Sequence, residues 1–170
     1  GCPGDPITIT LTIDPEPVMA PGLNNSVCSD GVSGIVLATN GTSVNAAGYN
    51  ILDIRVDASL VAGGGNAVIG NGQGPNAIAG DVFTNTTNAS LTVEYDVVPV
   101  SAAGCEGTMV TIVLTVAPEP VMAAGLDATV CSDENAGIVF STNGTSVTSA
   151  GYNILDFRED AGLVPTGGNA

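Results

Sequence analysis

The first part of the chain alternates strictly between aliphatic and polar residues. Ile7, Ile9, Leu11 and Ile13 are separated by threonines. In a strand this spacing places the aliphatic side chains on one face and the hydroxyls on the other, and β-branched residues favour that geometry. The pattern predicts a half-buried β-strand over residues 7–13.

Two later segments show the same alternation. Residues 91–97 alternate between apolar and polar side chains, and residues 110–116 repeat the pattern of residues 7–13. The connector between them, PVSAAGCEGT, is rich in turn-forming residues and has the length expected of a hairpin loop. An antiparallel pair is therefore predicted over residues 90–116.

The remaining pattern predicts short strands and no helix. GIVLATN at 34–40 and YNILDIRVD at 49–57 are expected to be strands, and the glycine-rich segment 61–80 is expected to be a loop with one short strand. No stretch combines helical periodicity with caps, so we expect no helix longer than a turn.

The whole pattern repeats with a period of 103 residues. PEPVMAPGLNNSVCSD at 15–30 returns as PEPVMAAGLDATVCSD at 118–133, and residues 1–67 align with 104–170 at 44 identical positions without a gap. This predicts the last strand of a preceding repeat at 1–14, a complete repeat at 15–117 and the N-terminal part of a truncated repeat at 118–170. We expect the chain to be a window from a longer tandem array, with any signal peptide upstream.

Each period has the size of an immunoglobulin-like β-sandwich. About seven short strands in about 100 residues are typical of that fold. Two prolines in each Pro-Glu-Pro sequence favour stiff, extended connectors between modules. The predicted linker residues are Pro15, Pro17, Pro118 and Pro120.

Composition narrows the classes of function. The chain has no Lys, no His, two Arg and 17 acidic residues, for a net charge of -15. Binding to nucleic acid is excluded because phosphate contacts need basic side chains. Charged residues are only 11% of the chain, which favours an extracellular protein. No apolar run approaches the roughly 20 residues of a membrane helix, so membrane insertion of this segment is not expected.

Several motifs together resemble a known family. CSD before GIVL, then TVEYDVVPVSAAGCEG, then a strand that ends in PEP are similar to the tandem PKD-like or Ig-like repeats in very large surface proteins of Bacteroidota. The resemblance covers the whole chain, although Asp30 and Asp133 replace the glycine of the family's Cys-Ser-Gly motif. It implies secreted adhesins, gliding-motility filaments or cell-surface fibres, and no catalytic residues.

The residues themselves also argue against an enzyme. Without His or Lys, the commonest general base and the commonest Schiff-base nucleophile are missing. Asp53 with Asp57, or Glu94 with Asp96, could act as a glycosidase pair. Solvated strand faces explain these pairs better, so we expect no catalytic residue and no organic cofactor.

Calcium binding is the remaining functional role for the acidic residues, because hard cations bind carboxylate clusters at junctions between extracellular modules. No Asp-x-Asp-x-Asp-Gly loop is present, Asp14 becomes Ala117 in the next copy, and simple surface charge is the alternative. The calcium candidates are Asp14, Glu16, Asp30, Asp53, Asp57 and Asp81.

Two smaller features have structural interpretations. Arg55, like its copy Arg158, is expected to form a local surface ion pair with the flanking Asp53 and Asp57. Five Asn-x-Ser/Thr sequences could be glycan acceptors in some secretory pathways but are better explained as turn formers. They begin at Asn24, Asn40, Asn85, Asn88 and Asn143.

These observations favour a structural repeat of an extracellular filament, stalk or giant surface adhesin, whose partners are neighbouring repeats or identical subunits. One alternative is an adhesin module that binds a glycan or surface, although Tyr49 and Tyr95 are better explained as core or strand-surface residues than as sugar platforms. The other is a fibre subunit in which residues 5–14 complete a neighbour by donor-strand pairing.

The cysteines occur twice per period, as Cys2, Cys28, Cys105 and Cys131, and in an exported protein they should be paired. Cys28 precedes the second predicted strand and Cys105 lies in the final hairpin turn, which immunoglobulin topology places at opposite poles. A seven-residue strand spans roughly 23 Å, whereas a disulfide needs Cα atoms within about 7 Å. Cys28 is therefore predicted to bond the hairpin-turn cysteine of the following module, and the pair Cys28 with Cys105 is the alternative.

Overall fold

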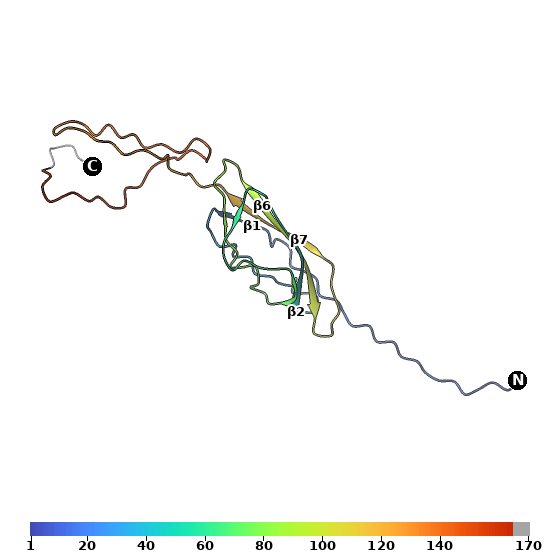
Figure 1. Cartoon of the computed structure of the whole chain (residues 1–170). Helices are drawn as coiled ribbons and strands as arrows, with labels where there is room; N and C mark the ends of the chain where they lie inside the picture. Colours follow the sequence, from blue (N-terminus) through green and yellow to red (C-terminus); the bar gives the residue numbers. More distant parts are fainter. Residues whose placement is uncertain (165–170) are drawn as a thin grey trace.

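The computed structural model describes residues 1–164 (Figure 1). The predicted repeat at 118–170 therefore includes six residues, 165–170, that lie outside the described residues. The described part of the chain contains strands and no helix, as the sequence pattern predicted. The strands are β1 (Asn25–Cys28), β2 (Ala46–Val56), β3 (Val61–Ala62), β4 (Gly70–Gln73), β5 (Phe83–Thr84), β6 (Leu91–Ser101) and β7 (Val110–Ala117).

Five strands form the main sheet in the order β1-β7-β6-β2-β4. β1 lies parallel to β7, whereas β6 is antiparallel to both β7 and β2. The predicted hairpin is confirmed, because β6 and β7 pair from Leu91 with Val116 to Val97 with Val110. The predicted strand at 49–57 is confirmed as most of β2.

The second layer is less regular. It contains the two-stranded ribbon β3-β5 and an extended segment, residues 30–37, that is bonded to residues 75–83. The predicted strand at 34–40 is wrong, since Gly34 adopts a left-handed φ of 64° and interrupts the pleat. The predicted loop at 61–80 also contains two short strands, β3 and β4, rather than one.

The core lies between these two layers. Its most buried side chains come from alternate positions of β6 and β7, and Val93, Tyr95 and Val97 of β6 are each 0% exposed. Ile35 and Ile78 of the second layer pack into the same cluster. Burial of each large aliphatic side chain contributes about 1.5–3 kcal/mol, so one sheet face supplies much of the stability of this β-sandwich.

Residues 1–14 are extended and lie outside the core. Ile7, Ile9, Leu11 and Ile13 are 82–85% exposed, so the predicted half-buried strand is not formed. The equivalent strand, β7, is bonded on one side by β6 and on the other by β1. Among residues 1–164, no strand pairs with residues 7–13.

Residues 118–164 repeat some local contacts of the first copy without forming a sheet. The bridge between Met122 and Thr142 copies that between Met19 and Thr39. The Oγ of Ser146 accepts a hydrogen bond from the amide of Val121, as Ser43 does from Val18. No helix among residues 1–164 has the length and apolar character needed to cross a membrane.

Candidate functional site

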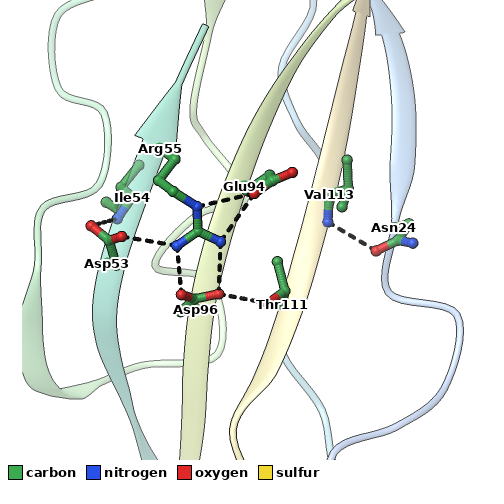
Figure 2. A network of polar contacts seen from close by, with 8 residues as sticks. All are labelled: Asn24, Asp53, Ile54, Arg55, Glu94, Asp96, Thr111 and Val113. Atoms are coloured by element: carbon green, nitrogen blue, oxygen red, sulfur yellow. Dashed lines mark hydrogen bonds and ion pairs between the residues drawn. The ribbon is translucent and has the colours of Figure 1, made fainter.

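Arg55 is the centre of a polar cluster on the outer face of the main sheet (Figure 2). Its guanidinium contacts Asp53 at 2.8 Å, Glu94 at 3.0 Å and both carboxylate oxygens of Asp96 at 2.6 and 3.1 Å. Thr111 of β7 donates a further hydrogen bond of 2.6 Å to Asp96. The cluster therefore links β2, β6 and β7 through their side chains.

Strand register brings these groups together. Arg55 is the direct partner of Glu94 and Asp53 is the partner of Asp96 across β2 and β6. Like charges directly opposite each other destabilise a sheet, so the cation between Asp53 and Asp96 offsets their repulsion. The hydrogen bond from Arg55, followed by that from Thr111, lowers the pKa of Asp96 to about 2.

The expected ion pair of Arg55 is confirmed for Asp53 and wrong for Asp57. Asp57 follows β2, and its carboxylate instead accepts the amide of Ser59 at 3.0 Å. The candidate pair Glu94 and Asp96 is bound to Arg55. In the second copy Arg158 contacts Asp156 at 2.6 Å.

The chain enters the module beside the β6–β7 turn, which we call the entrance end. Cys105 lies in this turn, and its Sγ is 3.9 Å from the carbonyl oxygen of Asp14. Pro17 of the linker is fully buried. A Cβ added to Gly107 would lie 1.9 Å from the carbonyl oxygen of Pro17, so only glycine allows this close approach of turn and linker.

The chain leaves at the exit end, where β1 and β7 both finish. Cys28 is the register partner of Ala117, and the amide of Ser29 donates to the carbonyl oxygen of Ala117 at 2.9 Å. The linker after β7 is held here as well, since the amide of Glu119 donates to the carbonyl oxygen of Asn85 at 3.0 Å. Desolvation and the neighbouring Asp30 raise the pKa of Glu119.

The structure does not bring the six calcium candidates together. Asp14 and Glu16 lie at the entrance end, Asp30 lies at the exit end, and Asp81 is buried in the core. Among residues 1–164 no group of three or more Asp, Glu, His or Cys side chains is arranged to hold a metal ion. Calcium binding by this chain stays a prediction.

Asn40 and Asn143 act as turn formers. Each accepts, through its Oδ1, the amides of the residues two and three positions later. Asn24 accepts the amide of Val113 at 2.9 Å. The turn-forming role is therefore confirmed for Asn40 and Asn143, whereas Asn24 contacts β7, 89 positions along the chain.

Asn85 has a role that its Asn-Thr-Thr sequence does not reveal. Its side chain is 0% exposed, and its Nδ2 donates to the carbonyl oxygens of Ala89 and Val116 at 2.9 and 2.8 Å. Because Nδ2 is the atom to which an N-linked glycan attaches, the folded module has no room for a glycan at this position.

The two tyrosines considered for sugar binding are core residues, as the sequence favoured. Tyr49 is 6% exposed and Tyr95 is 0% exposed. The hydroxyl of Tyr95 donates to the buried carboxylate of Asp81 at 2.7 Å, and burial is the main cause that raises the pKa of Asp81. Neither ring is open to solvent for stacking on a sugar.

All four cysteines are free thiols in the structure. Cys2, Cys28 and Cys131 are exposed, whereas Cys105 is partly buried beside Asp14. The predicted disulfide to a following module stays a prediction.

An all-β module with a five-stranded sheet, a parallel β1–β7 pair and a sandwich core defines an immunoglobulin-like class of domain. Comparison with known families identifies it further, because the PKD-like domain matches residues 26–120, from within β1 to the linker after β7. The chain belongs to the PKD-like domain family. No curated protein and no solved structure matches it.

Proposed function

We propose that this chain is a structural segment of an extracellular filament, stalk or giant surface adhesin, which transmits tension and performs no catalysis. The PKD-like domain suggests a structural or adhesive module. The observation that carries the proposal is the position of the two ends of the module. Residues 1–14 leave one end and residues 118–164 leave the opposite end (Figure 1), so modules of this kind can be joined in a line.

The pairing of β1 with β7 is suited to resist tension between the two ends of the module. β1 follows the entrance end and β7 precedes the exit end, and the two strands are parallel neighbours from Asn25 with Leu114 to Cys28 with Ala117. Tension between the ends pulls these strands in opposite directions along their axes. Their hydrogen bonds are then loaded together rather than one at a time, which resists separation.

The linker also favours a stiff array. Pro17 is fully buried and Met19 is 6% exposed, so the chain is fixed to the module within a few residues of Asp14. The repeat places Pro120 and Met122 at the equivalent positions before the second copy. A short proline-containing connector leaves adjacent modules little freedom to bend.

Electron microscopy of the native protein tests this proposal. We expect extended rods whose length grows with the number of repeats. Compact particles without any rod would overturn it. Reproducible hits on a glycan array would favour a binding adhesin. Fibres that dissolve in denaturant into polypeptides of only about the 16.7 kDa of this chain would favour donor-strand assembly.

A further inference from the structure

The two cysteines of one module lie at opposite ends of the main sheet. Cys28 finishes β1 level with Ala117, the last residue of β7, whereas Cys105 precedes the first residue of β7, Val110. Eight residues of extended chain span roughly 26 Å, and a disulfide needs Cα atoms within about 7 Å. These two thiols cannot bond each other while the module is folded.

The repeat places thiols from successive modules beside the same peptide group. Asp14 is the equivalent of Ala117 under the offset of 103 residues. The carbonyl oxygen of Ala117 accepts the amide of Ser29, the neighbour of Cys28 in the same module. The carbonyl oxygen of Asp14 lies 3.9 Å from the Sγ of Cys105, which belongs to the module that follows Asp14.

We propose that Cys28 forms a disulfide with the β6–β7 turn cysteine of the following module, and that Cys105 does so with the β1 cysteine of the preceding one. This inference rests on the tandem array of the proposed function. Both thiols are accessible, since Cys28 is exposed and Cys105 is partly exposed. The bond adds a second covalent connection beside the linker 118–120 at each junction.

The reaction is an oxidation that needs an electron acceptor. A small-molecule disulfide such as oxidised glutathione supplies one, because two protein thiols and one glutathione disulfide give one protein disulfide and two glutathione thiols. The first thiolate forms a mixed disulfide with one glutathione, and the second thiolate displaces that glutathione.

The test uses an extended chain, defined as residues 1–170 followed by a further copy of residues 68–117. Residue 170 is the equivalent of residue 67, so the addition completes the second module and supplies its turn cysteine. The protein then has five cysteines, four from the chain and one from the addition. It is equilibrated with oxidised and reduced glutathione at low protein concentration, and its free thiols are counted by alkylation and mass spectrometry.

The number of free thiols distinguishes the possible outcomes. One bond from Cys28 to the added cysteine leaves three free thiols, from Cys2, Cys105 and Cys131. Pairing within each module leaves one free thiol and overturns the proposal, as does a count of five. Rods seen by electron microscopy together with five free thiols would reject the disulfide and leave the structural function intact.

Matched variants locate the bond. Cys28→Ser is expected to leave four free thiols and no disulfide, whereas Cys131→Ser, at the equivalent position of the second module, is expected to keep the disulfide and leave two. A second protein, residues 1–117 followed by another copy of 15–117, contains two modules that each hold the whole core cluster. It must also show three free thiols, so the result does not depend on how residues 118–164 fold.

Discussion

At the scale of single residues, one guanidinium, that of Arg55, contacts three carboxylates on the outer face of the sheet. It is one of two basic residues in a chain of net charge -15. Its bidentate contact with Asp96 has the geometry in which Arg and carboxylate interact most strongly. The side chain of Asp96 is only 14% exposed, whereas those of Asp53 and Glu94 are 48% and 42% exposed, so Asp96 depends most on this contact.

Arg55→Gln is expected to raise the pKa of Asp96 from about 2 towards its ordinary value of about 3.9. A lowered pKa in the folded state means that ionised Asp96 stabilises the fold above about pH 4, and that this contribution disappears as the pH falls through about 2. Carboxyl NMR titration measures the pKa directly. Thermal unfolding of the parent and variant proteins should differ at pH 7 and converge near pH 2.

The second copy supplies the control for this prediction. Arg158 contacts Asp156 on an exposed segment, so Arg158→Gln should leave the titration of Asp96 unchanged. An Asp96 pKa near 2 in Arg55→Gln would show that Arg55 is not the cause of the shift.

At the scale of elements, the β6–β7 turn does more than connect two strands. It carries Glu106, which accepts a hydrogen bond of 2.9 Å from the buried Asn50 of β2, and Gly107, which packs against the linker. The turn therefore fixes the direction from which the chain enters the module. Position 107 of the turn therefore requires glycine.

Gly107→Ala is expected to lower the free energy of unfolding by about 2–3 kcal/mol, because the added methyl group would overlap the backbone of Pro17. Gly4 is the matched control, since it is the equivalent residue of the first copy and has no atom within 4 Å of an added Cβ. Urea unfolding of Gly107→Ala, Gly4→Ala and the parent chain measures the effect. Equal losses in the two variants would contradict the role of the turn.

The elements also show how far sequence reasoning reaches. β6 and β7 could be predicted because their long alternating patterns reflect one buried face. β2 could be predicted from its run of aliphatic residues, although its burial does not alternate. β1 could not, since the four residues NSVC are mostly exposed and take their place from parallel pairing with β7. The strand predicted at 34–40 is wrong, because the irregular backbone there depends on Gly34 and on the buried Ser33.

The contacts of the candidate site could likewise be predicted only in part from the sequence. The contact of Arg55 with Asp53 could be predicted from their spacing along one strand. Its contacts with Glu94 and Asp96 depend on the register between β2 and β6, which shifts at an irregularity between Ile51 and Asp53. The burial of Asn85 likewise depends on distant partners, so its sequence indicated only a turn or a glycan acceptor.

At the scale of the whole molecule, the second copy has apolar side chains that the first copy buries. Tyr152 is 40% exposed and Phe140 is 43% exposed, whereas their equivalents Tyr49 and Leu37 are 6% and 1% exposed. Tyr152 lines an open groove with Phe140 and Met122. In the first copy Tyr49 is paired with Pro99 of β6, so a β6 equivalent is the segment that would cover this groove.

The extended chain should therefore form a second complete module. We expect the calorimetric enthalpy of unfolding to rise to about twice that of the 170-residue chain, since enthalpy scales with the number of residues that fold at about 0.7 kcal/mol per residue. The chain has no Trp, so acrylamide quenching of tyrosine fluorescence reports the burial of Tyr152 against a Tyr152→Phe reference. A control chain that carries only the added residues 68–90 lacks equivalents of β6 and β7 and should leave Tyr152 open to quenching. If Tyr152 stays as accessible in the extended chain as in the control, the division of this sequence into modules of 103 residues is wrong.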